Sequence, residues 1–350
     1  MAPEAGDVVV AVDANGADLG PSEVAAAAAM AAEQGVRVLL FGPAEQMDRA
    51  PGVKIVDAPI SIAKAADPVR ATRLKPQASI VRAALAVARG EADALVSGGS
   101  TGAALAAGVL RIKRAPGIYR PALAVPIPVP GHPVTLLDVG ANTEARPEHL
   151  VQFAYMGAAL AQAVLGVERP RVGLLSNGEE AIKGTPLVLE AHAALSARVL
   201  ESASFEWVGN VEGTDLTSGR ADVIVSDGFT GNVTLKVMEG VSQTMLGAVR
   251  TAAMSSKRSK AGGMLLRPAL RDFRDDLDPE GAGGAYLLGL RRLGVVPHGR
   301  FTRYGISQAI LLAARGVRGD VVGRTHAALQ AAGALKSSPL SEPASTVQPS

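Results

Sequence analysis

The amino-acid sequence predicts an α/β fold with a mainly parallel sheet. Short runs of aliphatic and β-branched residues alternate along the chain with longer, alanine-rich segments of helical pattern, which is the order of repeated β-α-β units. Several of the short runs end in polar, glycine-rich turns. In open α/β folds the ligand site usually lies at such turns, where strands reach the carboxyl edge of the sheet. We therefore expect these turns to build the functional site.

The composition narrows the class of protein. Of the 350 residues, 48% are hydrophobic and 19% are charged, which is enough for a large soluble core. The absence of cysteine excludes disulfides, thiolate metal sites and a cysteine nucleophile. A net charge of +2 and 3% aromatic residues argue against nucleic-acid binding. No apolar run reaches the ~20 residues of a membrane span, and the amino end has no basic signal-peptide region, so we expect a cytoplasmic protein.

The first elements form a β-α-β unit: a strand over 7–13, a helix over 23–34 and a strand over 36–40. The first polar corner follows residue 13, where Asp13 and Asp18 could hold a metal or shape the turn, and we favour the turn. Neither the dinucleotide fingerprint nor the P-loop pattern occurs in the chain.

The second corner follows a strand over 53–56, a helix near Pro68, a helix over 78–89 and a strand over 94–96. Its residues, Ser97-Gly98-Gly99-Ser100-Thr101-Gly102, suit an anion. They also match G-x-S-x-G, the nucleophile elbow of α/β-hydrolases, in the required strand-turn-helix context. Because Asp138 or Asp227 and then His298 follow in the chain, a serine hydrolase using Ser100 is an open alternative.

The third corner ends a strand over 135–139 and reads Asp138-Val139-Gly140-Ala141-Asn142-Thr143. A helix over 147–164 and a strand over 172–175 lead to the next loop, 176–184. That loop carries Glu179, Glu180 and Lys183 directly after a strand, so an active-site loop and a solvated surface loop are both compatible with it.

The stretch 221–240 combines a buried strand over 223–225, a glycine-rich turn and a helix start. After Asp227 the turn continues with Thr230, Gly231 and Asn232. This order predicts free backbone N–H groups and a positive helix end for an anionic ligand such as phosphate. An ordinary βα turn is the alternative.

Composition changes after residue 239, since no acid occurs before Asp272 while basic and apolar residues accumulate. We expect 250–285 to form a small protruding helical tip that contacts an anionic membrane surface; an acidic protein partner or packing on a second subunit are the alternatives. Residues 281–289 are expected to be a flexible corner and 337–350 a disordered tail beyond a single domain over 6–336. The predicted contact residues of the tip are Lys257, Arg258, Lys260, Met264, Leu265 and Leu266.

Five segments together resemble the PlsX family of phosphate acyltransferases. They are Leu137-Asp138-Val139-Gly140-Ala141-Asn142, Pro147-Glu148-His149-Leu150-Val151-Gln152-Phe153, Gly178-Glu179-Glu180 with Ile182-Lys183-Gly184, Gly209-Asn210-Val211-Glu212-Gly213, and Ser226-Asp227-Gly228-Phe229-Thr230-Gly231-Asn232-Val233. The chain departs from the family at Asn15 and Ala17, where the family has methionine and glycine, and at Arg300, where serine is common. The family has asparagine where Ser100 stands here, which argues that this serine is not a required nucleophile.

The resemblance implies a three-layer α/β/α, Rossmann-like fold of the phosphotransacetylase and isopropylmalate dehydrogenase type, a homodimer and a peripheral membrane contact. It implies acyl transfer from acyl carrier protein to inorganic phosphate, giving acyl phosphate for phospholipid synthesis, without a cofactor or metal. Lys183 and Asn232 match the residues proposed as catalytic in the family. A non-catalytic lipid-binding scaffold is a third possibility, against which the polar corners argue. The expected phosphate- and substrate-binding residues are Gly98, Ser100, Thr101, Gly102, Asn142, Glu179, Thr230 and Gly231.

Overall fold

This computed structural model describes residues 8–129, 131–199, 204–276 and 278–336. The expected disordered tail, 337–350, lies outside the described residues.

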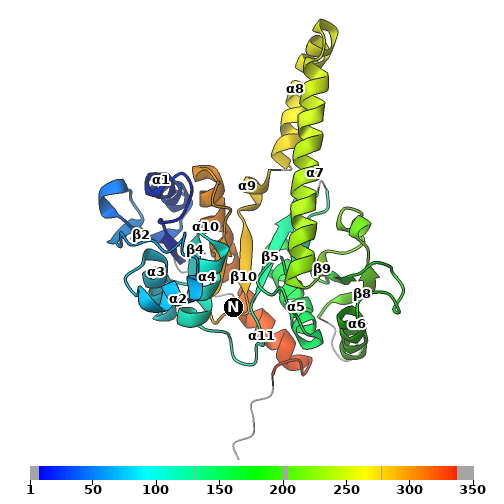
Figure 1. Ribbon diagram of the computed structural model, residues 1–350. Coiled ribbons are helices and arrows are strands. Elements are labelled where there is room, and N and C mark those ends of the chain that lie inside the picture. Colours follow the sequence, from blue (N-terminus) through cyan, green and yellow to red (C-terminus); the bar gives the residue numbers. More distant parts are fainter. Residues whose placement is uncertain (1–7, 130, 200–203, 277, 337–350) are drawn as a thin grey trace, which may run out of the picture.

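A single 11-stranded sheet runs through the molecule in the order β3-β2-β1-β4-β11-β10-β5-β6-β9-β7-β8 (Figure 1). Most strands are short and aliphatic, and β9 is completely buried, as expected for a strand covered on both faces. The strands are β1 Val9–Asp13, β2 Arg37–Gly42, β3 Val53–Asp57, β4 Ala94–Ser97, β5 Ala122–Ile127, β6 Val134–Leu137, β7 Arg171–Leu175, β8 Glu206–Val211, β9 Val223–Val225, β10 Ala285–Leu288 and β11 Leu293–Val296.

Helices cover both faces of the sheet, and the prediction of a three-layer α/β/α fold is confirmed. One apolar core packs α1, α5, α6, α10 and α11 against the sheet, and the other packs α3, α4 and the first turns of α7. The helices are α1 Pro21–Ala32, α2 Pro68–Leu74, α3 Ser79–Ala88, α4 Thr101–Ala107, α5 Pro147–Leu160, α6 Pro186–Val199, α7 Gly228–Met254, α8 Lys257–Asp276, α9 Pro279–Ala282, α10 Arg303–Arg318 and α11 Val321–Ala331.

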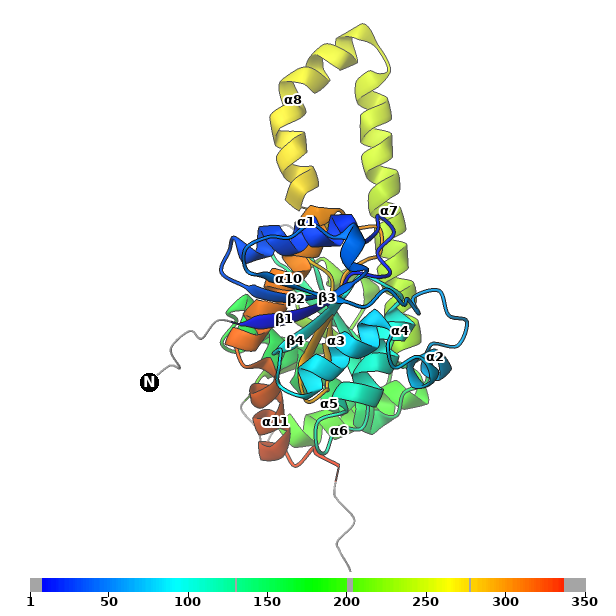
Figure 2. The same ribbon diagram turned by 90° about the vertical axis from the view of Figure 1, so that its left-hand side faces the viewer.

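The two halves of the sheet run in opposite directions. β10 is antiparallel to β11 and to β5, and β5 is antiparallel to β6, so β6, β9, β7 and β8 oppose the β1 half. Neighbouring strands rotate by about 20–25°, which accumulates to about 120–150° over the six steps from β1 to β9. The carboxyl ends of both halves therefore turn toward one side, where Figure 2 shows α4, after β4, and α7, after β9.

α7 and α8 form a helical hairpin that projects far from the body (Figures 1 and 2). Within α7 only Gly228 and Gly231 are buried, so nearly the whole helix is solvent-accessible. A helix of 27 residues is about 40 Å long. The projecting segment is therefore longer than the expected tip, because it includes most of α7 before residue 250.

The expectation of a flexible corner at 281–289 is wrong. Residues Ala285–Leu288 form β10, which pairs on both sides near the middle of the sheet, and Tyr286, Leu287 and Leu288 are buried. Glycines with positive φ at 283, 284 and 289 bracket the strand. These glycines make the turns into and out of a very short strand, which is why the sequence looks like a loop.

Candidate active site

The first corner is organised by Asp13, which is 2% exposed at the end of β1. Its carboxylate accepts hydrogen bonds from Ser79 Oγ (2.6 Å), Ser97 Oγ (2.8 Å) and the Asn15 N–H (3.1 Å). Burial raises the pKa of Asp13 to about 6, although these hydrogen bonds oppose the rise. Asp13 thus shapes the turn, and the described residues contain no cluster of three or more metal-ligating side chains.

The second corner places Ser100 as the N-cap of α4. Ser100 has an unstrained backbone (φ −69°, ψ 132°), and its Oγ accepts a hydrogen bond from Ala103 N–H at 3.1 Å. A nucleophile elbow instead needs a strained serine whose Oγ is paired with a histidine base. Among the described residues Ser100 has no such histidine partner. Gly98 is buried, whereas Thr101 and Gly102 are exposed at the start of α4.

The third corner is organised by Asp138, which is fully buried after β6. Its carboxylate accepts hydrogen bonds from the N–H of Leu123 (2.9 Å) and from three successive N–H groups at 140–142 (3.2, 3.0 and 2.7 Å). Burial raises the pKa of Asp138, and these donors oppose the rise. Asn142 Nδ2 donates to Asp138 (2.9 Å) and to Pro121 O (2.7 Å). Asn142 therefore uses its amide donors inside the protein, and its contact with phosphate stays a prediction.

The start of α7 does not offer the free N–H groups that the sequence suggests. Asp227 Oδ1 accepts hydrogen bonds from Phe229 N–H and Thr230 N–H, both at 2.9 Å, and Asp227 Oδ2 accepts one from Thr230 Oγ1 at 2.7 Å. Gly228 N–H donates to Asn142 O at 2.8 Å. The aspartate at the N-cap thus occupies the positive helix end where an anion was expected.

Asn232 lies one turn into α7 and is exposed. Its Nδ2 donates to Val139 O at 3.0 Å, which uses one of the two amide hydrogens. Gly231 lets the helix come this close to the third corner, because a Cβ at residue 231 would lie 2.0 Å from Asp138 O. The third corner and the start of α7 are therefore brought together as one unit.

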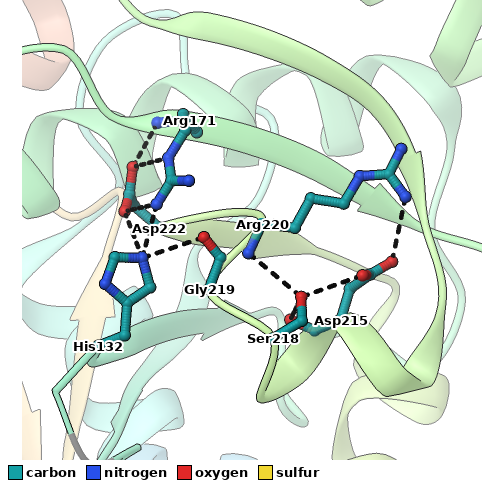
Figure 3. A network of polar contacts seen from close by, with 7 residues as sticks. All are labelled: His132, Arg171, Asp215, Ser218, Gly219, Arg220 and Asp222. Carbon is teal, nitrogen blue, oxygen red and sulfur yellow. Dashed lines mark hydrogen bonds and ion pairs between the residues drawn. The ribbon is translucent and has the colours of Figure 1, made fainter.

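The loop after β7 carries Glu179 and Lys183. Lys183 is exposed and makes no ion pair with a described residue. Glu179 Oε1 lies 2.6 Å from a guanidinium nitrogen of Arg220, which also contacts Asp215 at 3.4 Å. Figure 3 shows Arg220 beside Asp215 and Ser218 in this network.

Figure 3 also shows a second group of polar contacts, which connects the amino ends of β6, β7 and β9. Arg171 donates to both oxygens of Asp222 through Nε (3.1 Å) and a terminal nitrogen (2.8 Å), and His132 lies beside both. The Arg171 guanidinium holds the pKa of Asp222 below its usual range against the opposing effect of burial. These residues stabilise the amino ends of the strands and do not belong to the polar corners at the carboxyl ends.

A cavity of about 370 Å³ opens between the Lys183 loop and the start of α7. The cavity is lined by the apolar residues Leu150, Leu174 and Val188 and by the polar residues Ser176 and Thr230. Ser176 Oγ is buried there and has no hydrogen-bond partner among the described residues. Two further lining residues, Gly184 and Asp227, place the cavity directly beside the segments that carry Lys183 and Asn232.

The site residues form two groups. One contains the first and second corners with Gly299, since Asp18 N–H donates to Gly299 O at 2.8 Å. The other contains the third corner, the start of α7 and the Lys183 loop. Within the described residues no hydrogen bond or ion pair joins the groups. Charged residues near both groups nevertheless influence the pKa of His298. Partial burial, then Arg300 and Lys236 of α7, lower the pKa of His298, while Glu239 of α7 and Asp18 raise it.

The predicted tip residues all lie on α8, away from the corners (Figure 1). Lys257, Arg258 and Lys260 are exposed, and so are the apolar side chains of Met264 (70%), Leu265 (85%) and Leu266 (59%). No helix in the described part of the chain is long and apolar enough to cross a membrane.

The comparisons with structures agree on the fold. A phosphotransacetylase from Streptococcus pyogenes superposes with a TM-score of 0.61 over 89% of this chain and 94% of that protein, at 16% identity. The EutD phosphotransacetylase from Staphylococcus aureus gives 0.60 over 89% and 94%, at 18% identity. At such low identity these likenesses establish the architecture alone.

The comparisons with sequences establish the family. The profile of a family described as "Fatty acid synthesis protein" matches residues 8–324. A phosphate acyltransferase of Levilactobacillus brevis is 44% identical over 301 residues, covering 83% of this chain and 86% of the relative. That of Pelotomaculum thermopropionicum is 41% identical over 316 residues, covering 88% and 91%. The chain therefore belongs to this family, the PlsX phosphate acyltransferases.

Proposed function

We propose that this enzyme moves a fatty acyl group from the thioester of acyl carrier protein to inorganic phosphate and so forms acyl phosphate for phospholipid synthesis. The observation that carries the proposal is the cavity of about 370 Å³ between the segments that carry Lys183 and Asn232. It is lined by both apolar and polar residues, as a site for a thioester and a small anion requires.

In the proposed reaction a phosphate oxygen attacks the thioester carbonyl carbon. A C–O bond forms while the carbonyl π electrons move to oxygen, and collapse of the tetrahedral intermediate breaks the C–S bond and releases the carrier-protein thiolate. Lys183 supplies a cation for the phosphate. Asn232 has one amide hydrogen left after its bond to Val139 O, and this hydrogen can stabilise the oxyanion. The other predicted substrate contacts are Gly98, Ser100, Thr101, Gly102, Thr230 and Gly231. Asn142 and Glu179 are predicted contacts as well, and their side chains are already bonded within the protein.

The test measures phosphate-dependent release of carrier-protein thiol. Removing one donor that stabilises the transition state usually costs about 10²-fold to 10³-fold in turnover. We expect Lys183→Ala and Asn232→Ala each to lose turnover on that scale with little change in thermal stability, because both side chains are exposed. Lys75→Ala, which removes an exposed lysine at the C-cap of α2, is the matched control. Near wild-type turnover in both site variants would contradict the proposed roles.

We propose direct transfer without an acyl-enzyme. The chain has no cysteine, and Ser100 Oγ is engaged as an N-cap. Ser100→Ala should keep most of the turnover but lose about 0.5–2 kcal/mol of stability with the cap. Because both substrates must be bound together, initial-rate kinetics should be sequential. A covalent acyl adduct on Ser100, detected by mass spectrometry, would instead support the serine hydrolase alternative.

We also propose that the enzyme is a cytoplasmic homodimer with a peripheral membrane contact through the tip. Exposed apolar residues recur every four positions along α7, starting beside the site, and can pack against a second subunit. The basic residues of α8 suit anionic lipid or the acidic carrier protein. The exposed apolar residues of α7 are Phe229, Val233, Val237, Val241, Met245 and Val249.

A further inference from the structure

The loop that carries Lys183 must be held by residues outside it. Lys183 itself is exposed, and the loop makes its own turn through the bond from Lys183 N–H to Glu180 O at 2.9 Å. A catalytic group has to be held to within about 0.5 Å to be effective. A single local hydrogen bond at a solvent-exposed turn cannot provide this precision.

The side-chain amide of Asn210, on β8, holds this loop. It is fully buried, and its Nδ2 donates to Glu180 O at 2.9 Å and to Lys183 O at 3.3 Å. Both amide hydrogens are thus used on the two ends of the turn that presents Lys183. These hydrogen bonds are costly to break, because the fully buried Asn210 amide would lose its partners away from water.

A β-bulge aims Asn210 at the loop. β7 pairs Val172 with Trp207 and then Gly173 with Gly209, so Val208 is an extra residue in β8. Side chains normally alternate between faces, and the extra residue restarts the alternation. As a result Trp207 and Asn210, three apart, both contact α6, where Trp207 Nε1 donates to Ser196 Oγ at 3.0 Å. Gly209, with φ +80°, supplies the backbone conformation of the bulge.

His192 of α6 fixes the orientation of the Asn210 amide. Since Nδ2 faces two carbonyls, Oδ1 faces His192 and can only accept, so His192 donates from Nδ1 across 2.9 Å. The His192 ring packs edge-on against Trp207 with the ring centroids 5.5 Å apart. The amide is therefore held in one orientation by α6 and β8 together.

The ion pair of Glu179 and Arg220 contacts the loop from outside. Its two side chains are 57% and 33% exposed, so it contributes less than the buried contact. Arg220 is itself placed by Asp215 in the network of Figure 3. Glu179, which the sequence suggested for substrate, is engaged in this structural contact.

We propose that Asn210 is the positioning residue for Lys183, oriented by His192; this rests on the proposed catalytic role of Lys183. Asn210 lies in the segment Gly209-Asn210-Val211-Glu212-Gly213, which resembles the family but whose residues have no predicted role. It acts through the loop and does not contact the reacting atoms.

A double-mutant cycle tests whether Asn210 acts through Lys183. We expect Asn210→Ala to lower kcat about 10-fold with an unchanged KM for acyl-acyl carrier protein. In the Lys183→Ala background the same change should have no further effect, because the group that it positions is gone. Losses that multiply in the double variant would overturn the proposal.

His192 provides a second set of variants in case Asn210→Ala does not fold. His192→Ala should lower kcat, whereas His192→Asn should restore it, since its amide nitrogen can donate from the position of Nδ1. Ser196→Ala is the matched control, because it breaks another bond between α6 and β8 and leaves Asn210 untouched. Equal loss in His192→Ala and Ser196→Ala would mean that α6 packing, and not the amide, matters.

Amide hydrogen exchange separates failure of this proposal from failure of the proposed function. Faster exchange over 177–185 in folded Asn210→Ala or His192→Ala, but not in Ser196→Ala, is expected if Asn210 holds the loop. If Lys183→Ala keeps wild-type turnover, the role of Lys183 fails while the exchange result still decides the role of Asn210. Unchanged exchange in both variants would refute it.

Discussion

Three aspartates at strand ends give the corners their shape at the scale of single residues. Asp13, Asp138 and Asp227 each accept backbone N–H groups of the turn that follows them. Asp13 and Asp138 are buried, which raises the pKa of each carboxyl. These turns therefore stay rigid without a bound anion, and ligand contacts are left to side chains at the rim of the cavity.

Asp13 should make the stability of the enzyme depend on pH. Its folded-state pKa of about 6 exceeds the model-peptide value of 3.8, so folding favours the protonated form. This contribution to stability is complete below about pH 3.8 and is lost as pH rises through about 6. The loss corresponds to about 3 kcal/mol at about 1.4 kcal/mol per pKa unit.

Asp13→Asn cannot ionise and should not show this loss. Its free energy of unfolding, measured by urea titration, should gain about 2 kcal/mol relative to the parent protein between about pH 4 and about pH 7. Ser79 and Ser97 can still bond an amide in that position, and Asp67→Asn at an exposed N-cap is the control. Parallel stability curves for the parent and Asp13→Asn would show that the carboxyl is not destabilised by burial.

The residue patterns predicted the corners but not their internal bonding. Polar turns after aliphatic runs marked residues 97–102, 138–142 and 227–232, and the structure places them at strand ends. The role of Asn210 was not predictable, because it depends on a bulge and hence on the register between β7 and β8. No local pattern in the sequence specifies that register.

At the scale of elements, the helical hairpin shows where pattern reading fails. The change in composition after residue 239 predicts a tip that begins at residue 250, whereas no residue of α7 after Gly231 is buried and the helix already projects before residue 250. α7 carries apolar residues at a four-residue spacing that is equally typical of a helix packed on a core. The structure is needed to show that no described part of the chain covers the apolar face of α7.

The hairpin should bind anionic vesicles. Each basic residue near an anionic surface contributes about 1 kcal/mol, and the exposed Leu265 and Leu266 can enter the lipid. Binding of the parent protein should fall as salt is raised. The double variant Leu265→Glu, Leu266→Glu should stay in the supernatant during vesicle sedimentation and keep its thermal stability, because neither side chain packs on the body.

A control variant separates apolar insertion from charge. Thr251→Glu with Ser255→Glu adds the same charge near the turn of the hairpin but keeps both leucines, so it should lose less binding. If the leucine variant sediments with vesicles as the parent does, the exposed residues of α8 serve another partner, either the carrier protein or the second subunit.

At the scale of the whole molecule, residues from both halves of the sheet can form one site only because the sheet twists. The strands of the two halves are antiparallel, and the site residues form two groups without a shared hydrogen bond among the described residues. The sequence predicts a mainly parallel sheet with its polar turns at one edge. The reversal arises at the pair β5–β6: β10 is antiparallel to both β11 and β5, so β5 still runs with the β1 half, whereas β6 is antiparallel to β5. The pattern of residues along the chain does not specify these strand directions.

His298 can report whether α7 of one half lies beside β11 of the other. Partial burial lowers the pKa of His298, and the positive charges of Arg300 and Lys236 lower it further. Lys236→Gln removes one of these charges and also frees Glu239, its ion-pair partner at 2.8 Å, so the pKa of His298 should rise for both reasons. Since the chain has five histidines, an NMR titration can resolve this ring, assigned with His298→Asn.

Lys260→Gln, on the distant part of the hairpin, should leave the titration unchanged. Equal titration curves for the parent and Lys236→Gln would mean that the two groups of site residues do not face each other across α7, and a single site spanning both halves would then be untenable.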